Sequence, residues 1–436
     1  MENPWLIISI VFALILLFLA SGMWISGALG LVGLILILFF AGGGAERGIG
    51  MVLFNTVGNF TFIAVPLFIF MGEIILHSGI SERLYQGASS WVDFLPGGLL
   101  HTNIVSCSIF AAVSGSSMAT AATIGTVATQ ELIKRGYNKK LLLGSLAAGG
   151  TLGILIPPSI AMIIYGVIVK ESIGRLFIAG VFPGIVLSGL FMLYIGGATV
   201  LRPDLSPERL KFSIRRIGAS LLNMWPILVL IFLVLGTIYL GIATPTEAAA
   251  MGATGALILC AVYKKLSLKI FKESAVNAVS ITCWAMFIVL GAQILSMGLG
   301  LLKVPVQLAQ SVASLPVERA VIELLIVILY IILGMFIEAT SMMLLTIPIV
   351  FPIMTALGFD PVWTGVFIVI MIEMAQITPP VGINLYVIHG IAGKKYLSDI
   401  IIGVIPFVIC QIITVILLTV FPGLALWLPT QMIKRF

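Results

Sequence analysis

The chain has 436 residues, of which 60% are hydrophobic and only 9% are charged, and its formal net charge is +6. Soluble domains carry about 25% charged residues, so this composition excludes an ordinary soluble protein and indicates a polytopic membrane protein. The basic residues are spread over loops rather than gathered in a basic domain, so the charge gives no reason to expect nucleic acid as a partner.

Apolar runs long enough to cross a bilayer recur from end to end, and they do not alternate as the strands of a membrane β-barrel do. In the first half they predict helices at 5–22, 27–42 and 60–77, with an interfacial segment at 44–58. No positive charge precedes the first run, and a second apolar run follows it directly. A retained helix is therefore favoured over a cleaved signal peptide.

The next segment, at about 98–131, is hydrophobic but interrupted by the small polar turn Ser114–Ser117. Each arm is short for a full crossing, so we predict a re-entrant hairpin, covered by protein or lining a water-filled cavity. A helix broken by Pro157-Pro158 follows at 141–169, and then a helix at 177–199. The charged residues after it predict a cytoplasmic linker at 201–220.

The second half repeats this order. Its predicted elements are 222–240, 246–262, 277–298, a hairpin at about 319–356, a broken helix at 362–390 and a helix at 400–427. The broken helices align on Pro157-Pro158 and Pro379-Pro380, which lie 222 positions apart. We therefore predict an all-α polytopic membrane protein of two repeats, 1–200 and 221–436.

Each predicted repeat crosses the membrane an odd number of times, because three helices, one broken helix and a last helix make five and a hairpin adds zero or two. The two repeats must then be inverted relative to each other. Sixteen of the 23 basic residues fall on one side of this topology, and that side should be cytoplasmic. Both termini are then predicted to be periplasmic.

A helix broken inside the membrane exposes backbone N–H groups and carbonyls that an intact helix would pair. Half-helix N-termini favour anions, and free carbonyls favour a dehydrated cation. Because proline has no N–H, the proline pairs should leave carbonyls free near Gly153–Ile154 and Ala375–Gln376. A kink that only serves packing is the alternative for a single Pro-Pro, but two of them in register with two polar hairpins favour ion binding.

Acidic residues in apolar segments are weaker candidates, since an unpaired charge there costs about 2.5–3.5 kcal/mol. These acids are Glu73, Glu247, Glu323, Glu338 and Glu373. Glu338 is the strongest of them because it lies in the second hairpin. Gln376 and Asn384 flank the second proline pair, where a hydrogen bond to a neighbouring helix and a substrate contact are both open.

Motifs of other functional classes are missing from the sequence. It contains no His-Glu-x-x-His, no Gly-x-Ser-x-Gly and no Walker-type phosphate loop. We therefore expect neither an enzyme nor an organic cofactor. A channel would need only a pore, and a purely structural subunit would not need two broken helices.

Four motifs resemble the large membrane subunit (M subunit, DctM/SiaM-like) of tripartite ATP-independent periplasmic (TRAP) transporters. They are Phe110–Thr120, Gly153–Ser159, Ala243–Ala250 and Ile377–Gly382. The resemblance implies a sodium-coupled, elevator-type importer of an organic acid, such as a C4-dicarboxylate or sialic acid, in the bacterial inner membrane. It also implies two partners besides the lipid bilayer: a small Q-type membrane subunit, expected here as a separate chain, and a P-type periplasmic substrate-binding protein.

The resemblance also implies binding residues and at least two coupling sodium ions. The first sodium site would comprise Ala111, Ser114, Gly153, Ile156 and Pro158. The second would comprise Gly334, Ala375, Thr378 and Val381. Candidate substrate-binding residues are Ser116, Ser117, Thr340, Ser341 and Asn384. A sodium–carboxylate symporter that acts without a binding protein is the alternative.

Overall fold

The computed structural model describes residues 4–42, 44–207 and 213–433. Over these ranges the chain is helical and contains no strand, which confirms the predicted all-α class. The middle of the predicted linker, 208–212, and the chain ends that carry the predicted periplasmic termini lie outside the described residues. The described part of the linker contains one 3₁₀ turn, η3 (Pro203–Leu205).

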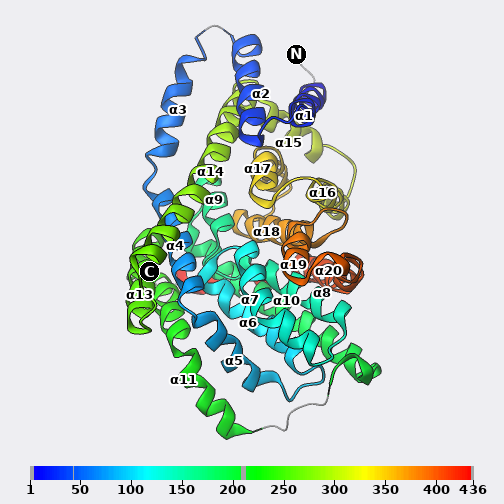
Figure 1. Cartoon of the computed structure of the whole chain (residues 1–436). Helices are drawn as coiled ribbons and strands as arrows, with labels where there is room; N and C mark the ends of the chain where they lie inside the picture. The colour runs from blue at the N-terminus through cyan, green and yellow to red at the C-terminus, as the bar shows by residue number, and fades with distance from the viewer. Residues whose placement is uncertain (1–3, 43, 208–212, 434–436) are drawn as a thin grey trace.

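The structure repeats its order of elements, as Figure 1 shows by colour. The first copy comprises α1 (Pro4–Ala20), α2 (Ile25–Phe40), α3 (Arg47–Val57), η1 (Phe60–Ile63), α4 (Ala64–His77), α5 (Ile80–Val92), α6 (Leu99–Ser114), α7 (Ser117–Lys134), α8 (Lys139–Thr151), η2 (Leu152–Ile154), α9 (Ile160–Val169) and α10 (Ile173–Leu201). The second comprises α11 (Ile214–Ile231), η4 (Phe232–Gly236), α12 (Thr237–Tyr239), α13 (Pro245–Val262), α14 (Leu268–Leu301), α15 (Val304–Ala313), α16 (Arg319–Gly334), α17 (Ala339–Ala356), α18 (Pro361–Ile377), α19 (Ile383–Ala392), η5 (Lys394–Tyr396) and α20 (Leu397–Val420), and α21 (Gly423–Ile433) follows.

The 222-residue period holds at the level of helices. The second arms of the two hairpins, α7 and α17, each have 18 residues and begin 222 positions apart, at Ser117 and Ala339. The largest difference is that α3, η1 and α4 correspond to the single helix α14. The first copy breaks at Gly58, where Asn59 caps the next turn, whereas α14 has Ser280 and Ile281 at these positions and continues.

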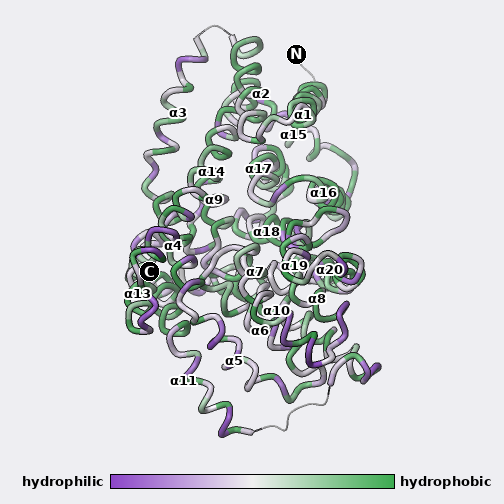
Figure 2. The backbone as a smooth tube through the Cα atoms, in the orientation of Figure 1, coloured by the Kyte–Doolittle hydropathy of each residue, from purple (hydrophilic) through white to green (hydrophobic). Residues whose placement is uncertain are grey.

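Seven helical stretches in the described residues are long and apolar enough to cross a membrane. They are Phe60–His77, Ile173–Leu201, Ile214–Tyr239, Pro245–Val262, Leu268–Leu301, Ala339–Ala356 and Leu397–Val420. Figure 2 shows hydrophobic residues along most helices, with hydrophilic ones gathered near helix ends and on α5 and α11. The sequence analysis did not predict the short helices α5 and α15, which lead into the two hairpins.

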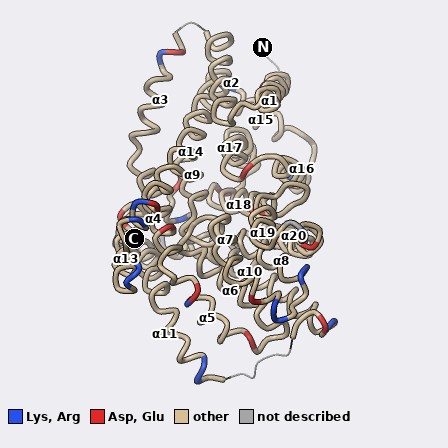
Figure 3. Tube along the Cα trace, viewed as in Figure 1, with Lys and Arg blue, Asp and Glu red and all other residues tan. Residues whose placement is uncertain are grey.

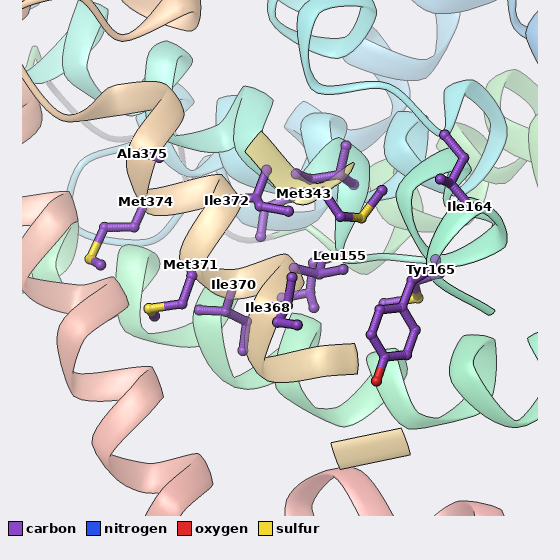
Figure 4. Close-up of a cluster of buried hydrophobic side chains, with 14 of the residues drawn as sticks. Leu155, Ile164, Tyr165, Met343, Ile368, Ile370, Met371, Ile372, Met374 and Ala375 are labelled. Carbon is purple, nitrogen blue, oxygen red and sulfur yellow. The ribbon is translucent and has the colours of Figure 1, made fainter. Parts of the chain in front are cut away.

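The centre of the molecule is formed by the two broken helices. Every residue from Val362 to Ile377 in α18 is buried, as is every residue from Leu141 to Thr151 in α8. Figure 4 shows the α18 side chains of Ile368 and Ile372 directed toward Leu155 of the first break and Met343 of α17. The two repeats therefore share one core.

Each hairpin packs on the first arm of its own broken helix, whereas the second arms cross over: α9 contacts α17 and α18, and α19 contacts α7 and α8. Figure 1 shows the first hairpin (α6, α7) below α18 and the second (α16, α17) above it, as repeats of opposite orientation would place them.

Helices α10 and α20 form one group with the hairpins and the broken helices, since α20 contacts α8 and α18, and α10 contacts α6, α9 and α18. The cause is close backbone contact. A Cβ on Gly144 of α8 would lie 2.2 Å from the carbonyl oxygen of Gly403 in α20. A second group is built in the same way: a Cβ on Gly33 of α2 would lie 2.5 Å from the backbone nitrogen of Leu295 in α14. This second group also contains α4, α11 and α13.

Candidate functional site

The tip of the first hairpin is a tight turn that docks on the first broken helix. Helix α6 ends at Ser114, and Gly115 adopts a left-handed conformation with φ of +61°. A Cβ at Gly115 would also lie only 2.9 Å from the carbonyl oxygen of Pro158. Ser116 then caps α7 by accepting a hydrogen bond from the Ala119 N–H. Glycine is therefore required here both by conformation and by space.

Hydroxyl groups fix the shape of this tip. The Ser114 and Thr120 hydroxyls are 2.8 Å apart, and the Thr120 hydroxyl donates to the Ser116 carbonyl, also at 2.8 Å. A Cβ added to Gly153 would lie 2.4 Å from the same Ser116 carbonyl oxygen. Gly153 thus permits direct contact between the first break and the hairpin tip. The predicted first-site residues Ala111, Ser114, Gly153 and Pro158 belong to these two touching segments.

The first break itself is ordered by Ser159. Its hydroxyl accepts a hydrogen bond from the Met162 N–H at the start of α9 and donates to the Ile154 carbonyl. The expectation of a free carbonyl at Ile154 was therefore wrong, because Ser159 replaces the missing N–H donor. A carbonyl oxygen has two lone pairs, so one acceptor position remains. The fifth predicted residue, Ile156, extends its side chain toward Gly184 of α10.

The second hairpin has the same construction with a different cap. Glu338, which is 222 positions after Ser116, caps α17, and its carboxylate accepts hydrogen bonds from the Ser341 N–H at 3.1 Å and the Ser341 hydroxyl at 3.3 Å. Gly334 lies against the second break, since a Cβ there would be 2.0 Å from the Ala375 Cβ. Two predicted second-site residues are thereby in contact. Glu338 and Ser341 bind each other.

The second break resembles the first, and both proline pairs are cis. The Thr378 N–H donates to the Ala375 carbonyl at 3.3 Å, so the prediction that this carbonyl is left free was also wrong. The Thr378 hydroxyl donates to the Met374 carbonyl at 2.6 Å. Val381 and Gly382 lead into α19. Sodium binding at either break stays a prediction.

Polar side chains also connect the two repeats at this level. The Ser117 hydroxyl donates to the side-chain oxygen of Gln376, and the Gln376 amide nitrogen is buried without a hydrogen-bond partner among the described residues. Asn384 is completely buried, and neither of its side-chain polar atoms has a partner in the described part of the chain. Buried polar groups are usually paired, so these amides are candidates for binding a ligand.

A cavity of about 50 Å³ lies between the first hairpin tip and α4. Ser114, Ser116 and Thr123 line it from the hairpin, and Gly72 and Glu73 from α4. Of the predicted substrate-binding residues, only Ser116 is among the described lining residues; Ser117, Thr340, Ser341 and Asn384 are not. The sequence analysis missed Thr123, although its position seven residues after Ser116 places it on the same face of α7.

The other intramembrane acids differ in their surroundings. The Glu73 carboxylate accepts a hydrogen bond from the Asn277 amide at 3.1 Å, Glu247 completes a capping box with Thr244, and Glu323 accepts a hydrogen bond from Thr419. Glu373 is fully buried, and its carboxyl oxygens have no hydrogen-bond partner among the described residues. Figure 3 shows few charged residues in the central layer.

Comparison with known proteins gives matches over nearly the whole chain. The family model described as the DctM component of the tripartite ATP-independent periplasmic transporter matches residues 12–424. The C4-dicarboxylate TRAP transporter large permease protein DctM of Pseudomonas aeruginosa is 35% identical over 404 residues, which cover 92% of this chain and 93% of that protein. The sialic acid TRAP transporter permease protein SiaT of Haemophilus influenzae is 31% identical over 387 residues, covering 87% of this chain and 62% of that protein.

A solved structure is similar in fold. The YdaH transporter of Alcanivorax borkumensis superposes with a TM-score of 0.63 at 17% identity, over 95% of this chain and 99% of that chain. Similarity at this level of identity concerns the fold alone. It supports the arrangement of two hairpins around two broken helices.

Proposed function

The chain belongs to the DctM component of the TRAP transporter family, and from this we propose that it imports an organic acid across the bacterial inner membrane by sodium-coupled secondary transport. The observation that carries the proposal is the contact between each hairpin and the broken helix of its own repeat. In the first repeat Gly153 lies beside Ser116, and in the second Gly334 lies beside Ala375. Broken helices that meet in the middle of the membrane are where secondary transporters bind substrate and coupling ions.

The residues at the breaks fit sodium ions. Sodium would be held by backbone carbonyls of Ala111, Ser114, Gly153, Ile156 and Pro158 at the first break, and by Gly334, Ala375, Thr378 and Val381 at the second. The close contacts at Gly153 and Gly334 support this, because small residues let carbonyl groups from two segments approach a single ion. Each sodium would supply a positive charge that also attracts the carboxylate of the substrate.

The cavity beside the first hairpin tip is the proposed substrate site. The N-terminus of α7 is directed at it, and the hydroxyls of Ser114, Ser116 and Thr123 line it. A helix N-terminus and hydroxyl donors favour a carboxylate. The names of the relatives suggest C4-dicarboxylates or sialic acid as substrates.

We further propose an elevator motion in which the hairpins, the broken helices, α10 and α20 move as one body. The scaffold would comprise α2, α4, α11, α13 and α14. Packing supports this division, since each group is internally joined by close backbone contacts such as Gly144 with Gly403. Each net positive charge moved inward gains about 2.3 kcal/mol per 100 mV, so two or more sodium ions with one monoanion would use the membrane potential.

The proposed partners are a small membrane subunit and a periplasmic binding protein. Because SiaT extends well beyond the region matched here, its additional length is consistent with a fused small subunit, and a small subunit is the partner that we propose for this chain. The chain would lie in the inner membrane with both termini periplasmic.

Uptake by proteoliposomes tests the function. The protein is reconstituted with its small subunit, and the uptake of a panel of radiolabelled organic acids is measured with the cognate binding protein present. We expect one acid to accumulate only under an inward sodium gradient. Equal uptake with potassium in place of sodium would contradict sodium coupling. Equal uptake without the binding protein would instead support a stand-alone symporter.

A further inference from the structure

A second cavity, of about 440 Å³, lies at the other end of α9, away from the hairpin tip. Three chain segments that are far apart in the sequence form it: 59–61, 166–174 and 244–246. The predicted topology, which is oriented by the loop charges, places all three segments on the periplasmic side. The segments come from both groups of helices, since α9 and α10 pack with the hairpins whereas α4 and α13 belong to the proposed scaffold.

Two long helices, α10 (from Ile173) and α13 (from Pro245), begin at the wall of the cavity, so the positive ends of two helix dipoles face it. The four-residue turn η1 also begins there, at Phe60. Lys170 adds a full charge, and no carboxylate in the described residues pairs with it. The one acidic residue of the lining, Glu171, pairs with Arg175 at 3.0 Å. The Glu247 carboxylate lies beside the cavity, where it accepts hydrogen bonds from the N–H and the hydroxyl of the lining residue Thr244.

An unused hydroxyl group points to a ligand. Thr246 is only 6% exposed and lines the cavity. Its hydroxyl makes no hydrogen bond in the described structure, whereas the neighbouring Thr244 is engaged in the capping box with Glu247. A buried hydroxyl at a helix N-terminus without a partner is expected to bind water or an anion.

Lys170 also has an unusual backbone. It is the C-cap of α9, with φ of +59°, a conformation that few residues other than glycine adopt. The cavity side of α9 therefore carries a lysine at a position where a glycine would be the expected residue.

We propose that this cavity is an entry site that binds the carboxylate group of the organic acid before the acid reaches the hairpin tip, through Lys170 and Thr246 beside the N-termini of α10 and α13. The inference depends on the proposed transport of an organic acid. Helix α9 has 10 residues, so the entry site lies about 15 Å from the first break. An anion held there would be released inward when the two helix groups move apart.

The electrostatic part can be tested without transport. The purified full-length protein, in a Cys283→Ser background that removes the exposed cysteine, receives Gly174→Cys. This position lines the cavity, its Cβ would have only ordinary contacts at 3.7 Å or more, and the substitution leaves Thr246 in place. The reaction rates of this variant with an anionic and a cationic thiosulfonate reagent are compared. We expect the anionic reagent to react faster, and Lys170→Gln to reduce the ratio of the anionic to the cationic rate by about sevenfold, because one unit charge at roughly 7 Å in water changes each rate by about 2.7-fold in opposite directions.

Lys303→Gln is the matched control, because Lys303 is also exposed, also has a left-handed backbone with φ of +55°, and was assigned to the same side. It should leave the rate ratio unchanged.

Protection identifies the ligand class. Millimolar succinate should slow the reaction with the anionic reagent, whereas succinamide of similar size should not. Equal rates for the two reagents, equal effects of the two lysine substitutions, or protection by succinamide would each overturn the proposal. None of these readouts needs sodium or the binding protein, so they fail or succeed independently of the uptake experiment.

Discussion

A single methyl group added at Gly153 should weaken sodium binding at the first break. A Cβ there would lie 2.4 Å from the Ser116 carbonyl oxygen, which belongs to the backbone and cannot rotate away. Gly153→Ala must therefore displace the hairpin tip, at a cost of about 1–3 kcal/mol. We predict that the sodium concentration for half-maximal uptake rises by about 5- to 150-fold.

The control for this substitution is Gly189→Ala in α10, where a Cβ would meet no atom within 4 Å. It should leave the sodium dependence unchanged. Fluorescence-detected size exclusion would confirm that both variants are folded. Unaltered sodium dependence in Gly153→Ala would mean that the first break does not bind sodium.

At the same scale, the sequence located the contacts between the hairpins and the broken helices better than it located the hydrogen-bond partners of individual side chains. The turn Ser114–Ser117 and the proline pairs marked the two contacts correctly, because small residues and prolines have direct backbone consequences. The role of Glu338 could not be decided from the sequence. An acid in an apolar segment can bind a ligand or cap a helix, and only the position of Ser341 shows that it caps α17.

Helix α9 starts inside the protein, and this makes its N-cap more important than an ordinary one. Ser159 is fully buried and satisfies both the Met162 N–H and the Ile154 carbonyl. Removing the hydroxyl leaves buried polar groups that water cannot reach, at about 1–3 kcal/mol for each group. We predict that Ser159→Ala clearly lowers the thermal unfolding temperature in detergent.

Ser172 offers a comparison of the same chemistry at the surface. It caps α10 through the Arg175 N–H, but it is exposed, so water can replace its hydroxyl. Ser172→Ala should cost only about 0.5–1 kcal/mol. Intrinsic tryptophan fluorescence during heating would follow the unfolding of both variants. Similar losses of stability in the two variants would show that water reaches the first break.

Among the elements, hydrophobic runs predicted the hairpins and the broken helices to within a few residues, because length and interruption are visible in the sequence. The short helices α5 and α15 were missed because they are amphipathic and lie between strong apolar runs. The pattern of hydrophobic runs also could not predict which helices α10 and α20 pack against. Contacts such as Gly144 with Gly403 join positions more than 250 residues apart, and an apolar helix carries no signal of its neighbour.

For the whole molecule, two cavities each collect segments that the predicted topology places on one side of the membrane. The entry cavity collects segments assigned to the periplasm, whereas a second polar cavity, of about 630 Å³, is lined by Glu82, Asp93, Glu131, Arg135 and Arg216 from segments assigned to the cytoplasm. The loop-charge count could predict which loops share a side. It could not predict that they enclose cavities where the two groups of helices meet.

The proposed motion between these groups gives a final prediction. Gly72 on α4 faces the first hairpin, and a Cβ there would lie 3.2 Å from the Ser114 Cα. Because this distance places the two Cα atoms no more than about 4.7 Å apart, and disulfide-bonded Cα atoms are about 4.4–6.8 Å apart, the pair Gly72→Cys and Ser114→Cys should form a disulfide in the Cys283→Ser background. The crosslink would join the scaffold to the moving group.

We expect oxidation of the double variant to abolish sodium-driven uptake in proteoliposomes and a reductant to restore it. Each single variant should be insensitive to the oxidant, which separates the crosslink from any effect of the substitutions themselves. If the fully crosslinked protein transports as fast as the same protein after treatment with the reductant, α4 and the first hairpin move together. The boundary between the scaffold and the moving group would then lie elsewhere, with α4 on the side of the hairpins.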